Sequence, residues 1–430
     1  MQIWIKMKPR KINNSQERFL EQRLCEQLNP HDEFYQLAEM IDWSFYEREF
    51  GEFYSEGASR PPKPIRLMVG LILIQNMYDL SDRAVVKHWL QNPYWQFFCG
   101  FDFLQWKFPI EPSTLTRFRK RLGEHGIAKI FKSTVKLAID ERVVSLKSLE
   151  KIIVDTTVME KNITHPTDAK LYHKARERLI KWCQKEGLQL RQSYTHVSKR
   201  ALHDVSRYAH ARQMKRAKRK TKQIKVYLGR VYRDALRCMR RLGMQKTAMP
   251  LFALIEAILH QDRTDANKIY SFHEPHVRCI SKGKAHKKYE FGCKVSIAIT
   301  HKEGLALDVS ALEGNPYDGH TLKEVLKRSE ENSERKIKMA FVDRGYRGHE
   351  VTDKIVYRSG QKRGVTKYIE SLIKRRQAIE PHIGHMKEEG KLRRNFLKGF
   401  IGDKINAILC GVGHNLRMIM RKLTPIPQFI

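Results

Sequence analysis

The order of apolar segments after residue 150 constrains the fold of this chain more than any other feature. Residues 151–158 read KIIVDTTV, a β-branched run typical of a buried strand. After a long helical stretch come two strands of a hairpin, a helix, a strand, a short strand and a final helix, at about residues 292–300, 304–312, 321–332, 338–343, 353–357 and 371–394. This order predicts an α/β core with a mixed sheet, in which the first and fourth strands lie side by side. A helical insertion separates the first two strands.

Those two neighbouring strands each end in an acid, Asp155 and Asp343. Open α/β sheets bind ligands at the carboxyl ends of their strands. The final helix adds Arg376, Glu380 and Lys387, whose spacing on a regular helix places them within about 40° of one another on the apolar face. Charged residues rarely lie on a buried face unless they are paired, hold a metal or catalyse. The alternative is a helix edge that grades into solvent, with Arg376 and Glu380 forming an ordinary surface pair.

Three carboxylates at one sheet edge require a counter-charge. Carboxylate oxygens select hard cations such as Mg²⁺ or Mn²⁺, and two such ions about 3.5 to 4 Å apart stabilise both the attacking and the leaving oxygen in phosphoryl transfer. Either aspartate alone is commonly a loop cap, so the prediction depends on all three acids. Pro381 follows Glu380 directly and kinks a helix unless it lies in a first turn, so Glu380 is the acid whose position depends most on the helix's course.

The charge of the chain predicts a polyanionic partner. Its 430 residues have room for two or three domains and contain 82 Lys and Arg against 47 Asp and Glu, a net charge of +35. Each phosphate that a basic residue neutralises releases counterions and strengthens binding. DNA or RNA is therefore the expected partner, and an anionic membrane is the weaker alternative.

The apolar and cysteine patterns indicate a cytoplasmic, nucleoid-associated protein. The longest apolar run, residues 67–74, is interrupted by Gly70 and is too short to span a bilayer, and no secretory signal precedes it. The seven cysteines include no C-x-x-C pair, so we expect reduced thiols rather than disulfides or a zinc site.

The helical insertion, residues 167–284, carries the densest positive charge. Between Arg212 and Lys246 there are fourteen Lys or Arg and a single acid, Asp234. A charge run is usually a solvated face, but this one repels itself strongly unless phosphates offset it. The candidate phosphate contacts are Arg216, Lys218, Arg219 and Lys220.

The amino-terminal part is predicted to be helical in two pieces. Residues 1–64 comprise helices and a proline-rich linker at 57–64, and residues 65–148 form a compact helix-turn-helix-like domain. In that domain we expect Ser81 to cap one helix and Ser113 or Thr114 to cap a later one. The exposed face of the later helix is expected to carry Arg117, Arg119, Lys120 and Arg121. Of these, Arg117 and Arg119 are the candidate DNA contacts, and a basic solvated helix is the alternative.

Four motifs resemble a known family. VDTTV, VDRGYRG and R-x₃-E-x₆-K resemble the three blocks of DDE transposases from bacterial insertion sequences, and GNPYDGHTL resembles a block between them. The similarity extends over about residues 29–420. It is strongest to the insertion-sequence-five family, related to the wider insertion-sequence-four group. The family's last block begins with a tyrosine, and Ile373 stands at that position, so the tyrosine's stacking or phosphate role is missing here.

The resemblance implies an RNase H-like core at residues 149–166 and 285–420, with Asp155, Asp343 and Glu380 as the catalytic, metal-binding triad. It also implies that Mg²⁺, or Mn²⁺ in its place, is the cofactor and that Arg376 and Lys387 contact phosphates near the scissile bond. The implied partners are double-stranded DNA, namely the terminal inverted repeats and the target, and a second copy of the chain on paired ends.

The implied reaction has two steps. Water attacks a phosphodiester at the transposon end, and the freed 3′-hydroxyl then attacks target DNA. Two alternatives stay open: an RNase H-like nuclease or resolvase, which would cut without joining, and a non-catalytic DNA-binding protein derived from a transposase. The presence of all three acids argues against the second alternative.

Overall fold

A computed structural model describes residues 22–53, 63–243, 249–281 and 288–423. The chain divides into two compact units, residues 1–160 with 294–430, and residues 161–293. The first unit contains the amino-terminal helices and most of the sheet, and the second contains the insertion helices. The first 21 residues and most of the predicted linker at 57–64 lie outside the described residues.

The amino-terminal helices surround one strongly apolar helix. Helix α4 has the sequence IRLMVGLILIQNM and is buried at every position except Arg66, because it offers no polar face to solvent. The helices of this region are α1 (Leu24–Gln27), α2 (Glu33–Met40), α3 (Trp43–Gly51), α4 (Ile65–Met77), α5 (Asp82–Gln91), α6 (Pro93–Phe98) and α7 (Pro112–Asp140).

One of the two predicted helix caps is confirmed. The Ser81 hydroxyl accepts a hydrogen bond of 3.1 Å from the Ala84 amide and begins α5. The predicted cap of α7 is wrong, because this helix begins at Pro112, before Ser113 and Thr114. Proline is well suited to a first helical position, where its missing amide hydrogen costs no hydrogen bond.

The core of the sheet is mixed, as predicted. The order of its five main strands is β4-β3-β1-β5-β6, with β2 added to β3 and β7 added to β1. Strand β5 is parallel to both β1 and β6, and β3 is antiparallel to β4. The order and the helical amino-terminal region are consistent with an RNase H-like domain. The strands are β1 (Lys151–Lys161), β2 (Arg278–Ile280), β3 (Glu290–Thr300), β4 (Ala306–Leu312), β5 (Met339–Val342), β6 (Ile355–Arg358) and β7 (Arg394–Asn395).

The expectation that Asp155 ends its strand is wrong. Strand β1 continues for six residues beyond it, to Lys161, because β1 has further neighbours, β3 and β7, in the sheet. Only the pairing with β5 stops there, since the last pair in that register is Val154 with Val342.

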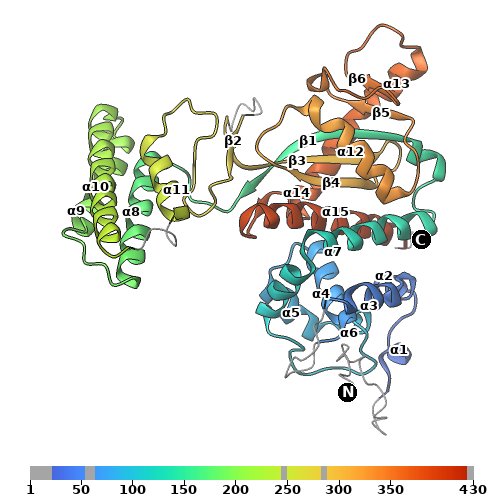
Figure 1. The fold of residues 1–430 in the computed structure, drawn as a ribbon. Coiled ribbons are helices and arrows are strands. Elements are labelled where there is room, and N and C mark those ends of the chain that lie inside the picture. The colour runs from blue at the N-terminus through green and yellow to red at the C-terminus, as the bar shows by residue number, and fades with distance from the viewer. Residues whose placement is uncertain (1–21, 54–62, 244–248, 282–287, 424–430) are drawn as a thin grey trace, which may run out of the picture. The chain divides into compact units, whose positions relative to one another are not determined.

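The helices after the hairpin complete the first unit. They are α12 (Asp318–Ser333), α13 (Lys367–Arg375), α14 (Ile379–Glu388) and α15 (Gly399–Leu423), with the short 3₁₀ turns η2 (Arg344–Tyr346) and η3 (Arg376–Ala378). A further 3₁₀ turn, η1 (Leu146–Glu150), precedes β1. Helix α15 lies along α7 and also contacts α4 and β4, so it joins the sheet to the amino-terminal helices (Figure 1). Gly413 permits this close approach, because a Cβ atom there would lie 2.1 Å from the Asn76 carbonyl oxygen of α4.

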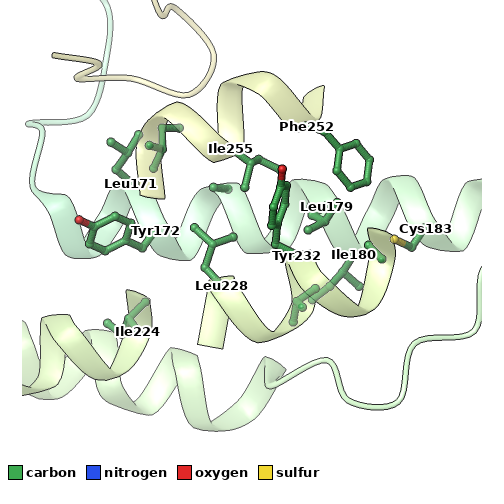
Figure 2. Packing of buried hydrophobic residues seen from close by; sticks show 14 of the residues in the cluster. Leu171, Tyr172, Leu179, Ile180, Cys183, Ile224, Leu228, Tyr232, Phe252 and Ile255 are labelled. Carbon is green, nitrogen blue, oxygen red and sulfur yellow. The ribbon is translucent and has the colours of Figure 1, made fainter. Parts of the chain in front are cut away.

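The described residues of the insertion form four helices around their own core. The helices are α8 (Asp168–Lys185), α9 (Thr195–His210), α10 (Met214–Arg241) and α11 (Met249–His260). Figure 2 shows Leu179 of α8, Leu228 of α10 and Ile255 of α11 in this shared core, with Tyr232 of α10 among them. The apolar stripe of α10 is therefore used for packing, and its basic residues remain on the opposite face.

Two further expectations concern cysteines and membranes. All seven cysteines are free, and five of them are buried. Across the described ranges, no helix combines the length and the apolar character that crossing a membrane requires.

Candidate active site

Parallel pairing brings Asp155 and Asp343 to neighbouring positions. Val154 of β1 pairs with Val342 of β5. Asp155 follows Val154 directly in the sequence, and Asp343 follows Val342. The side chain of Asp155 is 23% exposed and that of Asp343 is 51% exposed, so both carboxylates reach solvent at the edge of a buried apolar sheet. The predicted adjacency of the two acid-bearing strands is therefore confirmed.

Arg376 bridges the two aspartates. Its Nη1 lies 3.4 Å from Asp155 Oδ2, and its Nη2 lies 3.8 Å from Asp343 Oδ1. The arginine side chain is only 10% exposed, and a guanidinium so buried needs carboxylate partners. The structure thus places one positive charge between the two acids, where the sequence had suggested a contact with DNA phosphate.

The turn between β3 and β4 determines where Arg376 lies. The neighbouring Arg375 donates to the carbonyl oxygens of His301 (3.0 Å) and Lys302 (2.7 Å) in this turn. The ring of His301 bonds in return to the Leu372 carbonyl oxygen of α13 at 2.9 Å, and burial lowers the pKa of this histidine. These bonds hold the end of α13 against the sheet, so the next residue, Arg376, reaches the aspartates.

The predicted single helix at 371–394 is interrupted. Helix α13 ends at Arg375, the 3₁₀ turn η3 follows, and α14 begins at Ile379 with Pro381 in its first turn. A 3₁₀ turn advances about 120° per residue instead of 100°, so three residues shift the helical phase by about 60°. The shared inward face predicted for Arg376 and Glu380 is therefore wrong: Arg376 is buried and Glu380 is exposed. Lys387, the last residue but one of α14, is half-buried.

The two aspartates can bind a hard cation, and Glu380 is not grouped with them in this structure. Asp155 and Asp343 supply carboxylate oxygens from adjacent strands, and the Arg376 guanidinium shows that positive charge is accommodated between them. Among the described residues, no group of three or more His, Cys, Asp or Glu side chains is arranged to hold a metal ion. A cation at this position would thus be held by the two aspartates.

Three residues that the sequence analysis gave no role lie beside Asp155. Asp318, in the first turn of α12, accepts a 3.1 Å hydrogen bond from the Thr156 hydroxyl and lies 2.6 Å from Lys294 Nζ. Two sequence signals could have identified them. Asp318 belongs to the GNPYDGHTL block, and Lys294 is a charged residue inside the apolar strand GCKVSIAIT.

Arg119 is wrongly predicted as a DNA contact. It is buried, and its guanidinium donates to Asp82 Oδ2 (2.5 Å) and to Gln75 Oε1 (3.0 Å), so it joins α7 to α4 and α5. Arg117, Lys120 and Arg121 of the same helix are exposed, as expected. Helical phase explains the difference, since Arg119 lies next to Phe118 and four residues after Leu115, both of them core residues.

The basic residues of α10 mostly face solvent. Arg216, Lys218 and Arg219 are exposed, whereas Lys220 is partly buried and lies 3.2 Å from Asp204 of α9. The predicted lack of a counter-acid is therefore wrong for Lys220. The single acid of the run, Asp234, is buried and pairs with Arg237 at 3.0 Å.

Comparisons with known proteins identify two domains. Residues 22–121 match the family described as "Transposase domain (DUF772)", and residues 265–416 match the family described as "Transposase DDE domain". The second match contains Asp343 and Glu380, and Asp155 lies between the two matched stretches.

One curated relative matches about half of the chain. A protein of Rhizobium meliloti, named "Uncharacterized protein ORF8 in nfe locus", is 44% identical over 207 residues, which are 48% of this chain and 100% of the relative. No solved structure matches the chain. The paired aspartates at the sheet edge and the two transposase domains agree on a role in DNA transposition, and the chain belongs to the DDE transposases.

Proposed function

We propose that this transposase cleaves the ends of a bacterial insertion sequence of the insertion-sequence-five family and joins the freed 3′-hydroxyls to target DNA. The observation that carries the proposal is the pairing of Val154 with Val342, which makes Asp155 and Asp343 neighbours at a solvent-facing sheet edge. Two acids at this edge, with a buried arginine between them, suit a site where phosphate and metal charges meet.

Asp155, Asp343 and Glu380 are the proposed ligands of Mg²⁺, with Mn²⁺ able to substitute. When bound, the cation supplies Lewis-acid stabilisation of the charge that develops on the phosphodiester oxygens. Glu380 lies early in α14, directly after the η3 turn, so a modest rearrangement of this turn is the proposed route by which it joins the aspartates.

The reaction has two in-line displacements at phosphorus. In the first, water forms a new P–O bond, and the bond to the 3′-oxygen at the transposon end breaks, which leaves a free 3′-hydroxyl. In the second, this hydroxyl forms a bond to a target phosphorus, and a target 3′-oxygen leaves. Arg376 and Lys387 are proposed to offset phosphate charge beside the acids, since a guanidinium binds phosphate oxygens in the same forked geometry as carboxylates.

The remaining parts of the chain are proposed to hold DNA. Residues 65–148 act as a helix-turn-helix-like domain, and the insertion, residues 167–284, contributes phosphate contacts from the exposed face of α10. Two copies of the chain are proposed to act on paired transposon ends.

The direct test is incubation of the full chain with labelled DNA carrying the terminal repeats, a target plasmid and Mg²⁺. The expected products are cut ends and joined molecules that carry the label in the target. Cutting without joining would favour a nuclease or resolvase, and specific binding without cutting would favour a non-catalytic DNA-binding protein. Either result would overturn the proposal.

A further inference from the structure

Thr156 connects Asp155 to a second carboxylate. The amide nitrogen of Thr156 donates a 2.7 Å hydrogen bond to Asp155 Oδ1, and its hydroxyl donates a 3.1 Å hydrogen bond to Asp318 Oδ1. The same residue therefore restrains the Asp155 carboxylate and is itself restrained by Asp318.

Lys294 fixes Asp318 in turn. Its Nζ lies 2.6 Å from Asp318 Oδ1 and donates a 2.7 Å hydrogen bond to the Pro316 carbonyl oxygen. The lysine side chain is 8% exposed on an apolar strand, a position where an ammonium group is costly unless it is paired. Lys294 comes from β3 and Asp318 from α12, so the pair ties the helix to the strand next to β1.

Tyr346 lies near the same carboxylates. The tyrosine is 1% exposed, and its hydroxyl lies beside Ser296. Burial raises its pKa well above the usual value, and the carboxylates of Asp318, Asp155 and Asp343 raise it further.

We propose that Asp318 is a positioning residue of the active site: held by Lys294, it fixes Thr156 and thereby the orientation in which the Asp155 carboxylate binds metal. The proposal rests on the proposed metal-dependent function. Residues that hydrogen-bond to the groups around a metal ligand restrict its orientation, and their removal typically weakens metal binding or activity about 10- to 100-fold. Lys294 holds Asp318 in place through the 2.6 Å ion pair and is itself anchored on the Pro316 carbonyl oxygen.

The same helix provides a matched control. Asp308 of β4 is also buried, and its Oδ1 lies 3.0 Å from Arg328 Nε of α12. This second ion pair joins α12 to a strand in the same way, but the hydroxyl that donates to Asp308 belongs to Ser310 of β4 (2.6 Å), whereas the one that donates to Asp318 belongs to Thr156, the neighbour of Asp155. Loss of either pair weakens the attachment of α12, and only loss of Asp318 is expected to alter Asp155.

The experiment compares Asp318→Asn, Thr156→Val, Thr156→Ser and Asp308→Asn in the full chain. Mg²⁺ binding is measured by the rise in unfolding temperature as Mg²⁺ is added, and separately by the Mg²⁺ concentration that gives half-maximal end cleavage. We expect Asp318→Asn and Thr156→Val to require roughly 10-fold or more Mg²⁺ in both measurements. Thr156→Ser keeps the hydroxyl and should resemble the wild type, and Asp308→Asn should lower the unfolding temperature without changing the Mg²⁺ requirement.

Thr156→Val keeps the test decisive if Asp318→Asn does not fold. The inference is overturned if Thr156→Val binds Mg²⁺ as the wild type does, or if Asp308→Asn raises the Mg²⁺ requirement equally. Asp155→Ala separates this outcome from failure of the proposed function. If Asp155→Ala abolishes cleavage while Thr156→Val changes nothing, only the positioning role is wrong; if Asp155→Ala also leaves cleavage and Mg²⁺ binding intact, the metal site itself is wrong.

Discussion

The sheet and the insertion place their positive charge in opposite ways. At the sheet, Lys294 of β3 and Arg376 of the adjoining η3 turn are nearly buried, and each lies within 4 Å of a carboxylate. In the insertion, the basic residues of α10 lie mostly on the face opposite its apolar stripe and reach solvent. A buried cation paired with an acid holds both side chains in place, whereas many exposed cations together attract a polyanion. The predictions below test whether this division between positioning and attraction holds.

The largest effect is expected at the sheet edge. Asp155→Ala or Asp343→Ala should lower end cleavage by about 10³-fold or more, because loss of metal binding removes several kcal/mol of transition-state stabilisation. Binding to DNA ends should persist in gel-shift assays. Asp353→Ala is the control, since this exposed aspartate pairs with its neighbour Lys354 at 2.6 Å. Cleavage at the wild-type rate by a variant lacking Asp155, Asp343 and Glu380 together would refute the metal site.

Glu380 tests whether α14 belongs to the same site. Glu380→Ala should reduce cleavage as severely as loss of an aspartate, while the matched Glu388→Ala, an exposed residue of the same helix that pairs with Arg393, should not. The comparison is made by single-turnover cleavage at saturating Mg²⁺. Equal rates for the two variants would mean that the two aspartates work without an acid from α14.

The insertion should control the salt dependence of binding. Changing five exposed residues of α10 to Gln should weaken DNA binding and reduce the slope of log affinity against log salt by about 4.5, or about 0.9 for each lost phosphate contact. The residues are Lys215, Arg216, Lys218, Arg219 and Lys222. A control with the same charge change removes five exposed basic residues of the first unit, namely Lys323, Lys327, Arg335, Lys336 and Lys338. Equal slopes in the two variants would show that only net charge matters.

Two arginines of α7, Arg117 and Arg119, show both behaviours within one helix. Arg119→Met should destabilise the chain by about 3 kcal/mol in denaturant unfolding, because it leaves Asp82 without its buried partner. Arg117→Met should leave stability unchanged within about 0.5 kcal/mol and weaken binding to DNA ends. The reverse pattern would mean that burial does not separate the structural arginine from the binding one.

The sequence predicted the parts of the fold that depend on local pattern. Apolar runs marked the strands, and the order of elements placed Asp155 beside Asp343, because parallel pairing of β1 with β5 follows from that order. The family resemblance came from short blocks that lie in these same elements.

The failures have a common physical cause. Helical periodicity assumes an unbroken helix, so the three-residue turn before Ile379 placed Glu380 on the wrong face. The charge pattern of a helix likewise does not reveal a partner from distant sequence, and thus Arg119, paired with Asp82, was taken for an exposed residue. Asp318 was missed for the same reason, since its partners Thr156 and Lys294 lie far away in the chain.

The smallest expected effect concerns protons rather than DNA. His414 of α15 is fully buried, its ring lies 3.0 Å from the Gly304 carbonyl oxygen, and burial lowers its pKa to about 3. In the unfolded chain a histidine has a pKa of about 6.5, so acid protonates the unfolded state first. The stabilising effect of a neutral His414 is therefore complete above pH 6.5 and declines as the pH falls toward 3.

We expect this linkage to cost about 2 kcal/mol of stability between pH 7 and pH 5. His414→Gln, which retains a side-chain donor toward Gly304 but cannot be protonated, should remove that part of the pH dependence in denaturant unfolding. His210→Gln is the control from the insertion, because His210 is exposed on α9. If His414→Gln unfolds with the same pH dependence as the wild type, burial in the first unit does not keep His414 neutral. The contrast between the two regions would then hold only for lysine and arginine.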